Sequence, residues 1–568
     1  MEMISTDVLV IGGGLAASAA AIEASKYGAS VTLIDKGRFG RSGSTPTSGG
    51  SPHAYVPVEM GGDPEDSPQV FIRDNVEGGE YLCDQEMLGI LASQGMARIV
   101  DIERFGVPFE KENGRFKTSR TMGESYPRVG RVIGDGRALM DGLRAEVLKR
   151  GVRVLENMAV IHLLKDEGRV RGALAIRRQN GEPLLLEARA VILSAGGTTG
   201  IYGQSSANFL VSGDSYGLAL RAGAGLKNME FQEFTLVPAP FGRPIATAAI
   251  KGITAAGAKF YNEQGERFLE KYDAELMELS LRSRLTVAVA REYAQGRQAL
   301  LDATFLEKPV SHLPKVERAG FNWRRDRIPY VVAIHDSLGG IITDSEGRSE
   351  VPGLYAAGEA AGLQGTFGAD RAGGAILACL VFGHRAGAAC GAELAGKERG
   401  TPCGRDAITG EAERYFEGLK DRARGGGAEP GALKAEVRRL SDNCIGVIRN
   451  GDGLLHFLKE GTRLFDLSRR LPWKDPPAMI EAIEASSMVL TGLAIAASAL
   501  ERQESRGHHF REDRPKRDDA KELRWIVVRG GDPEGIQVTS SPVPFDRYSL
   551  RPPSCKGDGA RSAGEPSR

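Results

Sequence analysis

The sequence predicts an α/β fold in which a buried parallel sheet carries glycine-rich turns at the ends of its strands. Three apolar runs of strand length end in glycine: 6–11 before Gly12, 190–195 before Gly196, and 354–357 before Gly358. Continuous apolar runs are typical of strands buried on both faces, and glycine lets the backbone approach a ligand closely. We expect an α+β segment inserted into this domain and a helical domain after it.

The first run opens a dinucleotide-binding motif of the Rossmann type. Gly12, Gly14 and Ala17 have the G-x-G-x-x-A spacing, a helix follows them, and a second strand over 30–34 ends at Asp35. Gly12 suits the tight turn, Gly14 lets a pyrophosphate approach the helix N-terminus, and Ala17 packs helix on strand. Asp35 lies 21 residues after Gly14, close to the ~20 expected of a ribose-binding acid. Strand, helix and acid together favour a bound dinucleotide over an ordinary βαβ turn.

The loop that follows favours FAD over NAD. Lys36 precedes a stretch at 41–50 that is rich in glycine and hydroxyl side chains. Such a loop suits backbone hydrogen bonds to phosphate and to the flavin edge, although a plain polar turn is the alternative. The candidate cofactor-binding residues here are Lys36, Ser42, Gly43, Ser44, Gly49 and Gly50.

The second and third runs add further candidates around the same cofactor. Glu359 follows Gly358 and suits sugar hydroxyls, and a helix predicted over 375–389 would offer its N-terminal N–H groups to an electron-rich ring. Asp214 lies near a helix start, where an N-cap is the ordinary role. The candidates are Ala195, Gly196, Asp214, Gly358, Glu359, Gly374, Ala375 and Ile376. His335 and Arg371 flank these elements, so we expect both to converge on one cofactor.

These ordered motifs closely resemble the flavoprotein subunits of the succinate dehydrogenase and fumarate reductase family, which includes L-aspartate oxidase. The resemblance covers most of 5–530, including the signature at 504–513. It implies a glutathione-reductase-type FAD-binding domain with a capping domain. It also implies that His335 and Arg371 bind a substrate carboxylate and that Arg282 delivers a proton opposite the hydride. The resemblance further implies that Asp214 is a ligand in the flavin domain and not an N-cap. Many members carry a flavin-linked His at the position of Gly43, so we expect non-covalent FAD here.

The sequence departs from the family at the second half of the substrate site. The second carboxylate-binding His of the family falls on Thr235. The proton-relay Glu and Arg fall on Ala248 and Lys251, although Thr247 is kept. Ser283 replaces an Asp, and Ala375-Ile376 replaces an Asn-Ser pair. One carboxylate clamp therefore persists, which suits a substrate with one carboxylate and a neutral or bulkier far end.

The amino-acid composition limits the kinds of partner and cofactor that we expect. The 568 residues include 74 basic and 74 acidic side chains, so nothing indicates nucleic acid or a polybasic membrane patch. Six scattered cysteines without C-x-x-C argue against a metal site, an iron–sulfur cluster or a disulfide framework. We find no signal peptide and no apolar run of about 18 residues. We therefore expect a cytoplasmic protein without direct membrane insertion, reaching a membrane only through a partner.

The predicted organisation is modular. A helix is expected over 276–296, and Arg120, Arg128 and Arg131 are expected to be exposed or to face phosphate. A small β-meander is expected to end near 187, ahead of the second apolar run. The predicted units are an FAD-binding domain at 1–232 and 341–400, a capping domain at 233–340, a helical domain at 408–510, an extension with a hairpin at 511–550, and a disordered tail at 551–568.

The function expected from these features is FAD-dependent hydride transfer to or from the CH–CH or C=C bond of a carboxylate substrate. One alternative is a component of an electron-transfer complex with a separate iron–sulfur partner, acting on a substrate that is not a dicarboxylate. Another is a solo oxidase of the aspartate-oxidase type. A third is a flavin-binding protein with degenerate catalysis.

Overall fold

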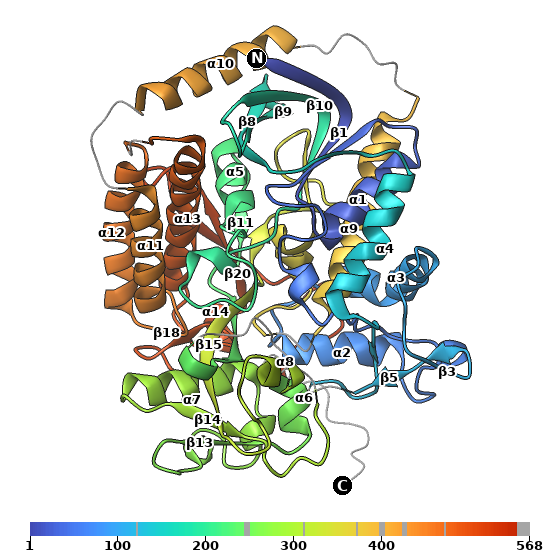
Figure 1. The fold of residues 1–568 in the computed structure, drawn as a ribbon, viewed down its shortest axis with the longest axis vertical. Helices are drawn as coiled ribbons and strands as arrows, with labels where there is room; N and C mark the ends of the chain where they lie inside the picture. Colours follow the sequence, from blue (N-terminus) through green and yellow to red (C-terminus); the bar gives the residue numbers. More distant parts are fainter. Residues whose placement is uncertain are drawn as a thin grey trace.

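The computed structural model describes residues 1–120, 123–242, 250–310, 313–370, 373–396, 404–422, 429–470 and 473–553. Its largest sheet has seven strands (Figure 1), with β7-β2-β1-β10-β9-β8 in order and β17 beside β10. The strands are β1 Glu2–Ile11, β2 Val31–Ile34, β7 Arg153–Leu155, β8 Met158–Asp166, β9 Arg169–Arg177, β10 Pro183–Leu193 and β17 Leu354–Ala356. The parallel neighbours β7, β2, β1, β10 and β17 confirm the predicted buried parallel sheet.

The predicted meander is not separate from this sheet. β10 is continuous: its first half pairs antiparallel with β9, and it also runs parallel to β1 and β17. The apolar run at 190–195 is thus the second half of a longer strand. The sequence suggested two elements because Glu187 interrupts the apolar pattern, but Glu187 is itself buried and bonded to Ser5 and Arg405.

Two helices cover one face of the sheet, and their backbones approach each other unusually closely. They are α1 Leu15–Ser25 and α9 Ala375–Leu394. A Cβ at Gly383 would lie 2.5 Å from the Ala16 carbonyl oxygen, and one at Gly387 would lie 2.2 Å from that of Ala20. Only small residues allow two helix backbones to approach so closely. α9 continues five residues beyond the predicted end because Leu394 is still buried against the core.

Two helices meet the length and composition of a membrane span, which corrects the expectation that no such run exists. They are α9 and α13 Pro476–Glu501, with mean hydropathy 1.4 and 1.6. The most apolar 18-residue window of α9 is 61% buried inside the fold, and that of α13 is 89% buried. The apolar surface of both helices is therefore largely used in internal packing.

The inserted segment forms its own four-stranded antiparallel sheet, at the bottom of Figure 1. Its order is β12 Gln232–Pro238, β15 Ile328–Ser337, β14 Ala299–Asp302 and β13 Lys259–Asn262. The helices α6 Ile250–Ala255, α7 Arg282–Ala294 and α8 Leu313–Arg318 lie beside it. The aromatic side chains of Phe260, Trp323 and Tyr330 fill its core. α7 begins at Arg282, not at 276, because 277–279 forms a separate 3₁₀ turn.

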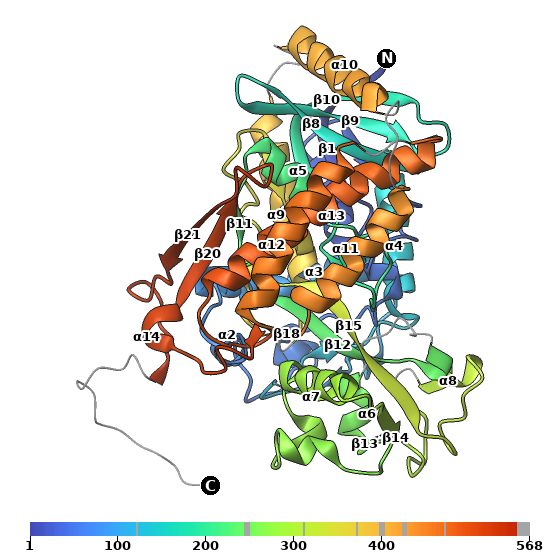
Figure 2. The same ribbon diagram turned by 90° about the vertical axis from the view of Figure 1, so that its left-hand side faces the viewer.

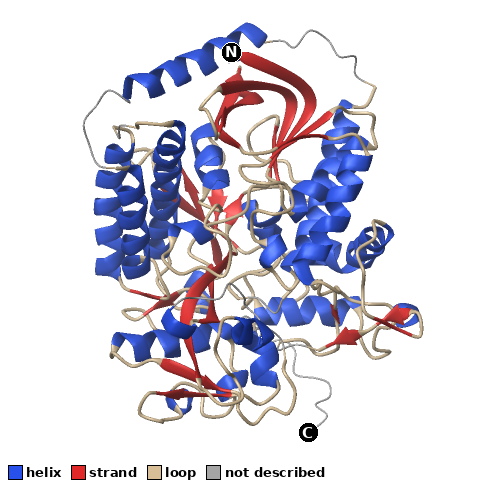
Figure 3. Ribbon diagram, in the orientation of Figure 1, coloured by secondary structure: helices blue, strands red, loops and turns tan. Residues whose placement is uncertain are grey.

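The last third of the chain adds a helical layer on the opposite side of the strands from α1 and α9 (Figure 3). It consists of α11 Pro430–Cys444, α12 Gly451–Ser468 and α13. α10 Arg405–Arg422 packs instead on β8, β9 and β10, as Figure 2 shows. The predicted hairpin is confirmed as β20 Arg524–Arg529 and β21 Gln537–Pro542. Most of the predicted tail, from 554 onward, lies outside the described residues.

The remaining elements are short or peripheral. The helices are α2 Pro68–Gly78, α3 Gln85–Arg104, α4 Asp135–Lys149, α5 Asp214–Ala222 and α14 Asp519–Glu522; the strands are β3 Lys111–Glu112, β4 Arg115–Phe116, β5 Thr118–Ser119, β6 Val129–Gly130, β11 Leu226–Lys227, β16 Gly340–Ile341, β18 Ile448–Arg449 and β19 Phe510–Arg511. β20 also pairs with β11, so the C-terminal hairpin extends a sheet begun near residue 226.

A buried charged network connects the C-terminal signature to the cap. Arg502 Nε donates to Glu230 Oε1 at 2.7 Å, and Arg506 donates to Glu504 at 2.6 Å. All four residues are at most 2% exposed. His509 lies among them, and burial together with the surrounding guanidinium charges holds its pKa well below the ordinary value. Because Glu230 lies two residues before β12, this network fixes the start of the strand that leads into the cap.

Candidate functional site

The first glycine turn has the geometry of a phosphate-binding loop. Gly12 follows β1 with φ +124°, and a Cβ there would lie 2.2 Å from the Ser194 carbonyl oxygen. Gly14 is the N-cap of α1 and provides no side-chain cap, so the first N–H groups of the helix face outward. Gly13, which the motif leaves variable, also needs to be glycine, because its Cβ would lie 1.9 Å from Asp35 Oδ2.

A continuous cleft joins this turn to three segments far apart in the sequence. Of the predicted cofactor-binding residues, those that line it are Gly12, Gly14, Asp35, Lys36, Ser42, Gly43, Ser44, Ala195, Gly196, Asp214 and Glu359. Those that do not are Ala17, Gly49, Gly50, Gly358, Gly374, Ala375 and Ile376. Gly13, Thr45 and Cys379 line the cleft without having been predicted. The strand ends at 11, 34, 193 and 356 thus meet at one edge of the sheet.

This cleft fits FAD by its polar chemistry. The hydroxyl oxygens of Ser44 and Ser194 are buried and make no hydrogen bond within the described chain, although both residues line the cleft. Buried hydroxyls without a protein partner are costly unless a ligand or water satisfies them. The open N-terminus of α1 is suited to the pyrophosphate. The residues that would hold FAD are therefore the glycine turn, the 42–45 loop and the turn at 194–196.

The carboxylates that line the cleft also accept hydrogen bonds from the protein itself. Asp35 accepts from the Gly37 N–H at 2.8 Å and from Ser42 Oγ at 3.1 Å, and burial raises the pKa of its carboxyl. Glu359 accepts from the Ser337 N–H at 3.0 Å. Each carboxylate is therefore oriented by the protein before any ligand binds.

Lys36 and Asp214 were predicted as separate cofactor ligands, but the structure pairs them. Lys36 Nζ lies 2.5 Å from Asp214 Oδ2 and 2.7 Å from Glu484 Oε1 of α13. Asp214 is the first residue of α5 and makes no cap hydrogen bond to the helix, so the N-cap alternative is wrong. Sequence reasoning missed Glu484 because it lies in a distant helix without a motif.

A second cluster lies in the cap. Arg282, the first residue of α7, forms an ion pair with Glu233 of β12. His335, which was expected before the β17 strand, lies inside β15 beside β12. Its Nδ1 is 2.7 Å from Ser206 Oγ and its Nε2 is 3.8 Å from Asp336 Oδ2. Side-chain ligand atoms of Glu233, His335 and Asp336 lie within 4.8 Å of one another. The structure thus brings Arg282 and His335 together around Glu233.

Arg371 lies outside the described residues, but the segment before it reaches the same cluster. Asp370 is buried and accepts a hydrogen bond from Ser283 Oγ at 2.8 Å. Its other oxygen is 3.1 Å from His508 Nε2, a residue of the C-terminal signature. Ser283 directly follows Arg282, and Asp370 directly precedes Arg371. The predicted proton donor therefore lies on a segment that contacts Asp370, the last described residue before Arg371.

Sequence reasoning missed Glu233, Ser206, Asp336, Asp370 and His508. A signal for Glu233 was available, since an acid two residues before Thr235 on a strand must share its face. No sequence signal indicates Ser206 or Asp370, because their partners are 129 and 87 residues away in the chain. The structure does not show where the positions of the family relay, Ala248 and Lys251, lie relative to this cluster. Residues 243–249 and the Lys251 side chain are outside the described residues.

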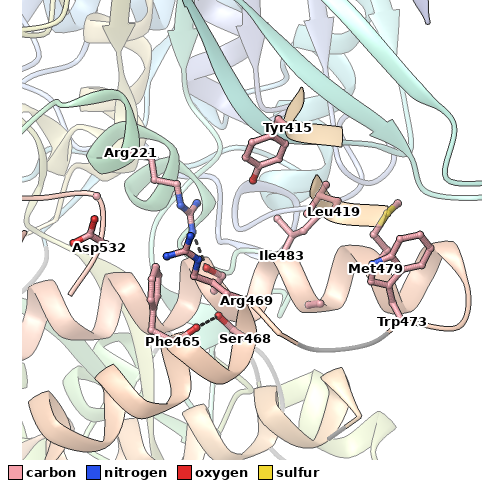
Figure 4. A pocket seen from close by; sticks show the side chains of 13 residues that line it. Arg221, Tyr415, Leu419, Phe465, Ser468, Arg469, Trp473, Met479, Ile483 and Asp532 are labelled. Carbon is pink, nitrogen blue, oxygen red and sulfur yellow. Dashed lines mark hydrogen bonds between the residues drawn. The ribbon is translucent and has the colours of Figure 1, made fainter. Parts of the chain in front are cut away.

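A second cleft lies apart from these residues (Figure 4). It opens between α5, α10, the C-terminal end of α12 and α13, and Arg221, Tyr415 and Trp473 are among its labelled side chains. No residue predicted to bind cofactor or substrate lines it. We therefore place the chemistry at the glycine-lined cleft and the adjoining cap cluster.

A glycine-turn cleft at the strand ends, together with an inserted cap that carries a guanidinium and an imidazole, defines an FAD-dependent oxidoreductase. Family models agree: residues 7–377 match an FAD binding domain, and residues 434–555 match the C-terminal part of fumarate reductase flavoproteins. The chain belongs to the succinate dehydrogenase and fumarate reductase flavoprotein family, and its cofactor is FAD.

Relatives and solved structures cover nearly the whole chain. L-aspartate oxidase of Caulobacter vibrioides is 33% identical over 548 residues, 92% of this chain and 96% of that protein. A fumarate reductase (CoM/CoB) subunit of Methanothermobacter marburgensis is 31% identical over 543 residues, 91% and 95% of the two chains. The Sdh1 structure of Mycobacterium smegmatis matches with TM-score 0.84 at 27% identity, covering 95% and 94% of the two chains. A quinol fumarate reductase structure from E. coli has TM-score 0.88 at 24% identity, covering 97% and 98%.

Proposed function

We propose that this oxidoreductase acts on the carbon–carbon bond next to a single carboxylate, and that its substrate is not a symmetrical dicarboxylate. The observation that carries the proposal is the cap cluster. Arg282 and His335 converge on Glu233, while Thr235, at the position of the second carboxylate-binding His of the family, is wholly buried. Its hydroxyl oxygen finds no hydrogen-bond partner in the described chain. A neutral hydroxyl beside a carboxylate suits a far end that is not anionic.

The chain's own residues hold the substrate and manage one proton. His335 and Arg371 anchor the carboxylate, and arginine suits this task because its planar fork stays charged and binds bidentately. Arg282 delivers the proton on the side opposite the hydride. The cap excludes water from the site, which strengthens these charged contacts. FAD, when bound, supplies the hydride chemistry. We propose that FAD is held non-covalently, since Gly43 provides no side chain to bond it.

The electron partner can belong to either of two classes. The similar Methanothermobacter protein is named as a subunit, which supports a separate partner subunit. The similar Caulobacter protein is an L-aspartate oxidase, which supports a solo enzyme that passes electrons to oxygen. We favour a complex in which the partner carries this chain to any membrane. Co-purification with an iron–sulfur protein supports this, and rapid reoxidation by oxygen with peroxide formed contradicts it.

The substrate proposal is tested with reduced protein. Photoreduced enzyme is titrated anaerobically with a panel of mono- and dicarboxylic enoic acids, and the return of the oxidised flavin band near ~450 nm is followed. We expect monocarboxylates with an uncharged far end to reoxidise the flavin faster than fumarate. A clear preference for fumarate would refute the single-carboxylate proposal. Reoxidation by none of the acids would favour the degenerate flavin-binding protein.

A further inference from the structure

Glu233 occupies a place that no motif singled out, directly against the proposed proton donor. It is wholly buried in β12, and its carboxylate forms an ion pair with the Arg282 guanidinium at the start of α7. The Arg282 side chain is only 10% exposed. A buried guanidinium needs a counter-ion, because an unpaired charge away from water is strongly destabilising. Glu233 therefore fixes where Arg282 lies.

The strand pairing places His335 beside this ion pair. β12 and β15 are antiparallel, with Glu233 opposite Asp336 and Phe234 opposite Ile334. His335 is thus an extra residue on β15, and the ladder shifts register at this point. Such a bulge redirects a side chain and is common beside active sites. The bulge brings the imidazole toward Glu233, so that donor, counter-ion and proposed carboxylate anchor form one group.

The three ligand-type residues here do not require a metal ion. Glu233, His335 and Asp336 lie close enough to bind one. However, the Arg282 guanidinium already contacts the Glu233 carboxylate and supplies positive charge there. A divalent cation at the same place would be repelled by this charge. The cluster is therefore better explained by proton handling than by metal binding.

Proton delivery by arginine needs a group that restores the proton. A guanidine that has given up its proton is a strong base, so Arg282 must regain a proton before the next turnover. In the family pattern a Glu and an Arg serve this purpose, but the sequence has Ala248 and Lys251 at those positions. Ala248 cannot carry a proton. Glu233 does carry a carboxyl group, and that group contacts Arg282.

We propose that Glu233 positions Arg282 and returns a proton to it in each turnover. The inference rests on the proposed reduction of a carbon–carbon double bond. Arg282 gives its proton to one substrate carbon while the hydride goes to the other, so two C–H bonds form and the π bond is lost. Glu233, which is ionised while it pairs with the charged Arg282, then takes a proton from solvent and passes it to the neutral Arg282 side chain, and this transfer restores the ion pair. His335, with 21% of its side chain exposed, and Asp336 connect Glu233 toward solvent.

The experiment compares Glu233→Gln, Glu233→Asp and a matched control. Glu278 is the control because it is also a buried cap carboxylate paired with an arginine, Arg267, at 2.9 Å. All variants are first shown to hold FAD and to bind the best acid in the oxidised state. We expect Glu233→Gln to lower kcat by about 10²-fold or more, with little change in KM. Glu233→Asp should recover part of the loss, and Glu278→Gln should stay within about threefold of wild type.

The solvent isotope effect separates proton return from mere positioning. In Glu233→Gln, proton return becomes slow, so the ratio of kcat in H₂O to kcat in D₂O should rise above the wild-type ratio. A kcat within about twofold of wild type would overturn the proposal. So would a large fall in kcat with an unchanged isotope ratio and no recovery in Glu233→Asp, which would leave Glu233 as a structural residue.

A double-mutant cycle tests the pair without any turnover. Glu233→Gln, Arg282→Met and the double variant are unfolded in urea. If Glu233 is the counter-ion of Arg282, the double variant should lose less stability than the sum of the single variants. Additive losses would overturn the inference even if a substrate is found. If coupling is present but no acid is reduced by wild type, the proposed reaction fails, and with it the proton-return step, while the positioning contact stands.

Discussion

Lys36 Nζ lies 2.5 Å from Asp214 and 2.7 Å from Glu484, so one cation just after β2 connects this strand to α5 and to α13. Glu484 also binds Lys434 Nζ at 2.5 Å. The ion cluster therefore joins the cofactor cleft to the C-terminal helices. It makes the stability of the cleft depend on a helix that lines none of it.

The pH dependence of stability should report this cluster. Burial would raise the pKa of Glu484, but the charges of Lys36 and Lys434 outweigh it and lower that pKa to about 2 from the ordinary 4.5. A lowered folded-state pKa gives stability that is fully present above pH 4.5 and is lost as the pH falls toward 2. Glu484→Gln should lose about 3 kcal/mol at pH 7, and the gap from wild type should shrink below pH 4.5.

Urea unfolding of both proteins at neutral and acid pH measures this gap. Glu417→Gln is the control, because Glu417 is 65% exposed and pairs only on the surface of α10 with Lys420. Its stability should match wild type within about 0.5 kcal/mol. A gap for Glu484→Gln that is the same at every pH would show that the ion cluster does not act through charge.

Arg128 should be among the stabilising residues of the region at 55–130. It was expected to be exposed, but it is 1% exposed and donates to both Asp66 and Asp74 at 2.6 Å. Arg128→Ala would remove the guanidinium that two buried carboxylates share, so we expect a loss of about 3–5 kcal/mol in urea unfolding. Arg131→Ala is the comparison, since Arg131 is 67% exposed and should cost about 0.5 kcal/mol or less.

Sequence reasoning found the parts of the site that obey local rules. Apolar runs and glycine spacing predicted the glycine turn, the strands beside it and helix α9. These features are predictable because strand and helix periodicities depend on residues that are close in sequence. Arg128, Glu233 and Glu484 were missed or misjudged because their environment comes from chain contacts that are distant in sequence, such as Arg128 with Asp74, 54 residues away. Arg120 was correctly expected to be exposed. Charged residues give no local sign of whether the fold will bury them.

Gly12 should be indispensable for holding FAD. Its φ of +124° suits glycine alone, and an added Cβ would lie 2.2 Å from the Ser194 backbone oxygen. We expect Gly12→Ala to purify with little bound flavin, measured as the ratio of flavin to protein absorbance. Gly89→Ala is the control, because Gly89 lies within α3 with no atom within 4 Å of an added Cβ. Normal flavin content in Gly12→Ala would contradict this assignment of the turn.

The flavin should separate from the chain on denaturation. Gly43 lines the cofactor cleft with φ +83°, and no atom lies within 4 Å of an added Cβ. Glycine has no side chain to bond a flavin, so acid precipitation of the purified protein should leave the yellow colour in the supernatant. Gly43→His would supply an imidazole, but the positive φ disfavours any side chain there, so we expect it to hold less FAD than wild type. A flavin fluorescence band that migrates with the wild-type chain on a denaturing gel would show a covalent link at another residue.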